Sequence, residues 1–184
     1  MLLVLQDEIQ RPSKEERKKL SYTVPYFPGA VGHIDGVVHR RNRPSFKQSL
    51  FYRKDKRFHF ISTQVTVDHS GRIMHIETGF PGSLTDQSNF INSELTQKEN
   101  DFFSPGEYML ADSVYFHPLL VTPFLSIECQ NNPLYVAWSR LQRANRHVVE
   151  WTIGQIEVFM ATCHKFRHTI PLQTQAKGGI IAYK

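Results

Sequence analysis

The chain has 184 residues, a net charge of +5 and a pI near 9.3. Its hydrophobic content of 40% and charged content of 21% are ordinary for a globular protein, and its length suits one domain with a buried core. The two cysteines, Cys129 and Cys163, are too far apart for a disulfide framework or a zinc site of CxxC spacing. The apolar start is too short for a signal peptide or a membrane span, so we expect a soluble, intracellular protein with no membrane partner.

The first residues predict a peripheral extension followed by a short strand. Residues 1–29 contain a helix-permissive run at 14–19, and Pro25 and Pro28 prevent a longer helix. Residues 30–34 predict a strand that delivers Asp35 at its end, with Gly36 forming the turn. An Asp-Gly step after a strand is usually only a turn, so this pattern alone is weak evidence of function.

Positive charge is concentrated in residues 40–57, where one acid, Asp55, stands among eight basic residues. The basic residues are Arg40, Arg41, Arg43, Lys47, Arg53, Lys54, Lys56 and Arg57. Aromatic residues alternate with them, as is typical of a surface that contacts nucleic-acid phosphates. A solvated basic hairpin gives the same pattern, so the segment alone does not decide.

A β-hairpin is predicted over residues 58–80, because residues 58–67 alternate and 68–71 have turn composition. Thr85 is a predicted helix cap, which makes Asp86 by default a first-turn residue that balances the helix dipole. Residues 108–111 predict a strand buried on both faces that ends at Asp112. Residues 119–124 fit a strand or a connector, and residues 128–137 are predicted to be irregular.

The last predicted element is a long helix over residues 139–163. Its apolar stripe consists of Leu141, Ala144, Val148, Trp151 and Ile156. Arg140, Arg143 and Arg146 lie along one flank, and Glu150 follows Arg146 by four residues, where a plain salt bridge is the commoner outcome. The tail is residues 171–184. The order of elements predicts an α/β fold: a mixed β-sheet flanked by helices, with acids at strand ends and on the long C-terminal helix.

Asp35, Asp112 and Glu150 have the chemistry of a site for divalent metal. Mg²⁺ and Mn²⁺ prefer oxygen ligands, and two such ions can activate the attacking oxygen and stabilise the leaving oxygen of a phosphodiester. Other classes are not supported: Ser113 lacks the glycines of a nucleophile elbow, and neither a Walker loop nor a dinucleotide fingerprint occurs.

Six segments, in this order, resemble the DDE superfamily endonuclease domain, in particular that of PIF/Harbinger transposases and of the Harbinger-derived nucleases of animals. They are residues 32–36, 67–72, 79–88, 110–115, 122–124 and 146–150. The resemblance covers about residues 30–170, which we take as the nuclease domain.

This resemblance implies an RNase H-like fold and a divalent metal cofactor, Mg²⁺ or Mn²⁺. It implies that Asp35, Asp112 and Glu150 are catalytic and that they bind metal together with Asp86. The basic residues expected to contact DNA phosphates are Arg53, Lys54, Lys56, Arg57, Arg140, Arg143 and Arg146. A separate DNA-binding partner protein and a location in the nucleus, with the cytoplasm as second compartment, are also implied.

The residues leave more than one function open. The first is a metal-dependent nuclease of transposase origin that acts on DNA. The second is a domesticated or truncated remnant that binds DNA or a protein partner without catalysis, which Val114, Trp151 and Glu157 favour because they depart from the family pattern. A third, a metal phosphohydrolase on the same kind of fold, would act on nucleotide monoesters.

Overall fold

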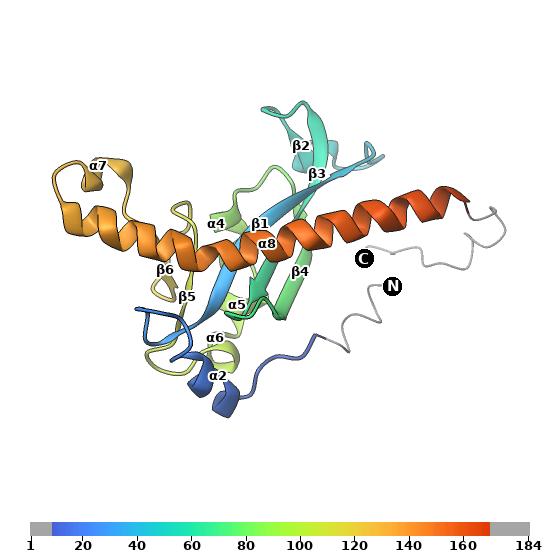
Figure 1. Ribbon diagram of the computed structural model, residues 1–184. Coiled ribbons are helices and arrows are strands. Elements are labelled where there is room, and N and C mark those ends of the chain that lie inside the picture. Colours follow the sequence, from blue (N-terminus) through green and yellow to red (C-terminus); the bar gives the residue numbers. More distant parts are fainter. Residues whose placement is uncertain (1–8, 170–184) are drawn as a thin grey trace.

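The computed structural model describes residues 9–169, and its elements are labelled in Figure 1. The strands are β1 (Ala30–Arg41), β2 (Tyr52–Arg53), β3 (Phe58–Val67), β4 (Ile73–Pro81), β5 (Tyr108–Leu110) and β6 (Leu120–Val121). The helices are α2 (Lys14–Leu20), α3 (Gln48–Phe51), α4 (Asp86–Ile91), α5 (Glu94–Gln97), α6 (Glu99–Phe102), α7 (Ser126–Cys129) and α8 (Pro133–Thr169). The predicted tail, residues 171–184, lies outside the described residues.

One mixed sheet of six strands forms the centre of the fold, in the order β2-β3-β1-β5-β6, with β4 also paired to β3. β3 pairs antiparallel with β1 on one side and with β4 on the other, whereas β5 and β6 run parallel to β1. The predicted hairpin is present as β3 and β4, and Gly71 in its turn has the positive φ, 86°, that glycine adopts without strain. The predicted mixed sheet flanked by helices is therefore confirmed.

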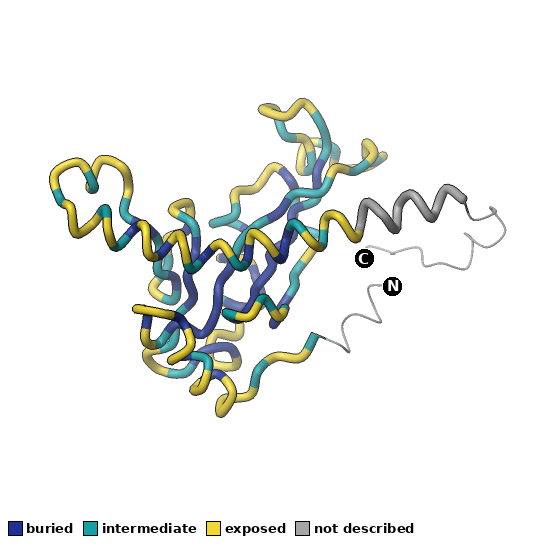
Figure 2. The backbone as a smooth tube through the Cα atoms, viewed as in Figure 1, coloured by how far each residue is buried: buried dark blue, intermediate teal, exposed yellow. Residues whose placement is uncertain are grey.

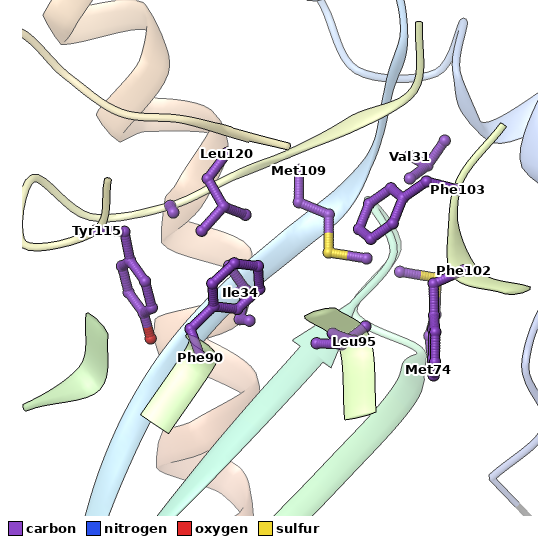
Figure 3. Close-up of a cluster of buried hydrophobic side chains, with 11 residues drawn as sticks. Val31, Ile34, Met74, Phe90, Leu95, Phe102, Phe103, Met109, Tyr115 and Leu120 are labelled. Carbon is purple, nitrogen blue, oxygen red and sulfur yellow. The ribbon is translucent and has the colours of Figure 1, made fainter. Parts of the chain in front are cut away.

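Helices cover both faces of this sheet and enclose its apolar residues. On one face, α4, α5 and α6 contribute Phe90, Leu95 and Phe102 to a cluster that also contains Ile34 of β1 (Figure 3). α8 crosses the other face (Figure 1), where Val149 packs in a second cluster with strand residues of β1 and β3. The β1 side chains therefore alternate between the two layers, which decides where each polar residue near its centre points.

Part of the extension preceding β1 packs on the sheet. Val24 and Phe27 are buried in a third cluster with Ala30, and the Phe27 ring lies 5.5 Å, centroid to centroid, from Trp138 of α8. Because prolines separate these apolar side chains, no periodic pattern identified them as core.

β1 is longer than predicted. It continues through Asp35 and Gly36 to Arg41, so the predicted turn at Gly36 is wrong. Asp35 pairs with Val65 and Gly36 with Gln64 of β3. The glycine instead leaves room for a neighbour: a Cβ at this position would lie 2.2 Å from a carboxylate oxygen of Asp86.

The long helix, α8, also differs from its prediction. It begins at Pro133, because proline is well suited to the first position of a helix, so the prediction of irregular residues 128–137 is wrong for part of that range. Its most buried side chains are Ser139, Gln142, Arg146, Val149, Thr152 and Ile153. The predicted apolar stripe is out of register with this face: Trp151 is 57% exposed. The N-terminal end of the helix, residues 133–137, extends beyond the sheet and is largely exposed (Figure 2).

None of the described helices combines the length and the hydropathy needed to cross a membrane.

Two glycine substitutions test how tightly the sheet is packed. A Cβ at Gly32 of β1 would lie 2.5 Å from the backbone oxygen of Val67, which cannot move without breaking the β1–β3 ladder. We expect Gly32→Ala to lower the free energy of unfolding by roughly 3 kcal/mol. Gly154 of α8 has open space around it, so Gly154→Ala should raise stability by about 1 kcal/mol through helix propensity.

Urea unfolding followed by circular dichroism measures both effects. Equal changes in the two variants would contradict the close packing of β1 against β3.

Candidate active site

The parallel register of β1 and β5 brings Asp35 and Asp112 to the same level of the sheet. His33 of β1 pairs with Leu110, the last residue of β5. Asp35 and Asp112 each follow that pair by two residues, one within β1 and the other in the loop after β5. The Asp35 carboxylate accepts a 2.8 Å hydrogen bond from the backbone N–H of Gly36. The Asp112 carboxylate accepts a 2.7 Å hydrogen bond from the backbone N–H of Ser113. The predicted acids Asp35 and Asp112 therefore lie on neighbouring segments of the backbone, one on β1 and one directly after β5.

Arg146 of α8 lies among these acids. Its guanidinium is 2.8 Å from Asp35 Oδ2, 3.9 Å from Asp112 Oδ1 and 2.5 Å from Glu150 Oε1. The Arg146 side chain is only 11% exposed, whereas those of Asp112 and Glu150 are 40% and 44% exposed. The structure thus brings the three predicted catalytic acids around one buried cation.

Asp86 approaches β1 from the layer formed by α4. Thr85 caps that helix by accepting a hydrogen bond from the Ser88 N–H, as predicted for this start, and Asp86 is its first residue. The Asp86 carboxylate lies over Gly36, and its backbone oxygen accepts a 3.0 Å hydrogen bond from the Gln64 side chain. Asp86 is therefore fixed beside Asp35 by the bare backbone at Gly36.

The charges of these acids act on one another. Burial raises the pKa of Asp35, the Arg146 guanidinium opposes that rise, and the nearby Asp112 and Asp86 add to it. Burial also raises the pKa of Asp86, with Arg53 lowering it and Asp112 raising it. Asp35 and Asp86 are therefore costly to ionise at this site, and a nearby positive charge offsets part of that cost.

The predicted DNA-contacting residues have different environments. Arg53 forms two hydrogen bonds with Asp55, at 2.9 and 3.1 Å, and its charge also acts on Asp86. Lys54, Lys56 and Arg57 are exposed beside it, and Arg140 and Arg143 are exposed on α8. Arg146 is instead turned towards the acids. DNA contact by these seven residues remains a prediction.

Several polar residues at this site were not singled out from the sequence. Gln64 is 1% exposed, and its side-chain nitrogen also lies 3.4 Å from the Tyr115 hydroxyl. Gln142 of α8 is fully buried and donates to the backbone oxygens of Ala111 and Val121, at 2.7 and 3.0 Å. Burial raises the pKa of Tyr115, as do the charges of the neighbouring acids. Gln64 stands among Ser62, Thr63 and Thr66 in β3, so nothing in the local sequence distinguished it from its polar neighbours.

The donor set suits a hard divalent ion, since Asp35, Asp86, Asp112 and Glu150 all offer carboxylate oxygens. Among residues 9–159, whose side chains the structure describes, however, no group of three or more His, Cys, Asp or Glu side chains is arranged so that it could hold a metal ion. The guanidinium of Arg146 lies between the acids. The chemistry of the residues fits such an ion, whereas their present spacing fits the arginine.

Antiparallel strands followed by parallel ones, with acids from the sheet and a covering helix meeting at one place, define the RNase H-like class of nucleases. The chain belongs to the DDE superfamily endonuclease family, whose model matches residues 34–177. The predicted family is confirmed.

Curated relatives are proteins named "Putative nuclease HARBI1". The proteins of Rattus norvegicus, Homo sapiens and Mus musculus are 27%, 26% and 28% identical over 147 residues. The alignment covers 79% of this chain but only 39% of each relative. These relatives agree with the resemblance to Harbinger-derived nucleases. No solved structure matches significantly.

Removing the positive charge of Arg146 tests the ion pairs. In Arg146→Met, three carboxylates lose their shared cation, so the free energy of unfolding should fall by about 2 kcal/mol. This is less than the roughly 3–5 kcal/mol lost on breaking a fully buried pair, because Asp112 and Glu150 are partly exposed. The matched control is Arg143→Met on the exposed surface of α8, which should change stability by less than about 0.5 kcal/mol. Denaturant unfolding measures both free energies. If Arg146→Met had the same free energy of unfolding as the wild type, the ion pairs would contribute nothing to stability.

Proposed function

We propose that this chain is a divalent-metal-dependent nuclease domain of transposase origin that cuts DNA phosphodiesters. The observation that carries the proposal is the meeting of Asp35, Asp112 and Glu150 around one cation, from β1, the loop after β5 and α8. Asp86 adds a fourth acid over Gly36. The chain spans 39% of the length of the relatives, so this proposal concerns the domain and not a complete protein.

The proposed roles of the residues follow from their positions. Asp35, Asp112 and Glu150 would hold Mg²⁺ or Mn²⁺, with Asp86 assisting. The bound ion would supply positive charge at the scissile phosphate and favour deprotonation of the attacking water or hydroxyl. Gly36 and Gln64 position Asp86, and the backbone N–H of Ser113 orients Asp112.

Basic residues outside the acid cluster would bind the DNA backbone. Arg53 is the last residue of β2, and Lys54, Lys56 and Arg57 lie in the turn that joins β2 to β3, at the end of the sheet (Figure 1). Arg53 is near enough for its charge to act on Asp86. Phosphates held by this segment would therefore lie near the acids, and the affinity would fall as salt increases.

The partner and the location belong to the same proposal and are supported by the family resemblance alone. We propose that a separate DNA-binding protein assists targeting and that the protein acts in the nucleus.

A nicking assay tests the proposed activity. Supercoiled plasmid in Mn²⁺ should be nicked by the wild type, and Asp112→Asn should reduce the rate by at least roughly 100-fold, because even residues that only support metal ligands are worth 10–100-fold. The control, Asp101→Asn, changes an exposed acid of α6 and should retain the wild-type rate. Equal nicking by wild type and Asp112→Asn would exclude this site. Hydrolysis of a nucleotide monoester but not of plasmid would favour the phosphohydrolase.

The second candidate is a remnant that binds DNA or a protein without catalysis, and the position of Arg146 among the acids favours it. Calorimetric titration with Mn²⁺ separates the two functions. A nuclease site should bind Mn²⁺ in the wild type, and Arg146→Met should bind it more tightly because the competing cation is gone. Absence of Mn²⁺ binding in both proteins would favour the remnant.

A further inference from the structure

The loop between β5 and β6 carries both Asp112 and an exposed aromatic ring, that of Phe116. It spans residues 111–119, with Asp112 as its second residue, and Phe116 is 89% exposed, the highest value among the large hydrophobic residues described. Val114 in the same loop is 53% exposed. A single exposed apolar side chain is ordinary on a protein surface. Whether Phe116 has a binding role therefore depends on how the loop is held.

The backbone of Phe116 is fixed on both sides by one side chain. The Gln87 side-chain nitrogen donates to the Phe116 carbonyl oxygen, and its side-chain oxygen accepts from the Phe116 N–H, each over 2.8 Å. The preceding residue, Tyr115, is 2% exposed and packs edge-on against Phe90, with ring centroids 6.1 Å apart (Figure 3). Tyr115 anchors the loop in the core, and Gln87 holds the next residue with its ring in solvent.

This arrangement connects Phe116 to the acid cluster. Gln87 directly follows Asp86 at the start of α4, and Phe116 follows Asp112 by four residues. Arg53, from the basic segment, acts on the same Asp86 through its charge. The backbone that carries the exposed Phe116 ring is therefore tied to the residue next to Asp86, and Asp86 is also under the influence of a cation of the basic segment.

A nucleobase is the chemical group that matches such a ring beside a phosphodiester site. Stacking of a base on an aromatic side chain contributes about 1–3 kcal/mol and tolerates every base. A base inside a duplex already has both faces covered, so a protein ring can stack only on a nucleotide that is unpaired or displaced from the helix.

We propose that Phe116 stacks on an unpaired nucleobase of the DNA beside the phosphodiester to be cut, and that Gln87 positions it. The ring therefore selects distorted or single-stranded DNA at the site. This inference rests on the proposed DNA substrate.

Binding without turnover tests it. The probes are a 30-base-pair duplex with one bulged 2-aminopurine and the same sequence fully paired, both in EDTA. The wild type should bind the bulged duplex more tightly and quench the 2-aminopurine fluorescence. Phe116→Ala should weaken binding of the bulged duplex by roughly 5- to 100-fold, abolish the quenching and leave the paired duplex unaffected. Phe116→Trp should retain both properties.

Two further variants separate stacking from other effects. Tyr22→Ala removes a 77% exposed aromatic side chain just after α2 and should match the wild type. Gln87→Ala keeps the Phe116 ring but frees its backbone, so quenching should fall while the paired duplex still binds normally.

Unchanged quenching in Phe116→Ala would overturn the proposal while leaving DNA binding intact. Wild-type protein that binds neither duplex would overturn both this inference and the proposed substrate. If Phe116→Ala changed only self-association in sedimentation, the ring would be a protein contact and the proposal would be wrong.

Discussion

The ion pairs of Arg146 are the interaction on which the geometry of this site depends. One guanidinium links a central strand, the loop after its parallel neighbour and the long helix, through Asp35, Asp112 and Glu150. Burial takes water away from Asp35 and, with the repulsion of Asp112 and Asp86, raises its pKa. A buried cation offsets that cost and fixes the rotation of α8 over the sheet. The same residue that stabilises the acids therefore also determines which face of the helix is covered.

That requirement explains the unusual composition of the buried face of α8. Helices that cover a sheet normally place an apolar stripe against it. Here Ser139, Gln142 and Arg146 come first, and only further along do Val149 and Ile153 restore apolar packing. Gln142 satisfies backbone oxygens next to β5 and β6, and Arg146 satisfies the acids. The helix thus meets polar groups with polar side chains where the strands end, and apolar groups with apolar side chains over the hairpin.

These features separate what could be predicted from the sequence from what could not. The β3–β4 hairpin and the Thr85 cap follow from alternation and local hydrogen bonding, so they were predicted correctly. The continuation of β1 through Gly36 was missed, because the reason for that glycine is Asp86, which lies 50 residues away in the chain. The buried face of α8 was missed because apolar periodicity cannot identify a polar face. The candidate acids were found through the family motifs, and their arrangement around Arg146 depends on strand register, which local patterns do not contain.

The brevity of β6 has a consequence for how this protein behaves at high concentration. β6 has only two residues, and Pro118 and Pro123 flank it. A strand at the border of a sheet normally offers unpaired amides to a second chain, and proline and short length reduce that hazard. This border is therefore a poor template for intermolecular β-pairing, and the protein is protected there against edge-to-edge aggregation.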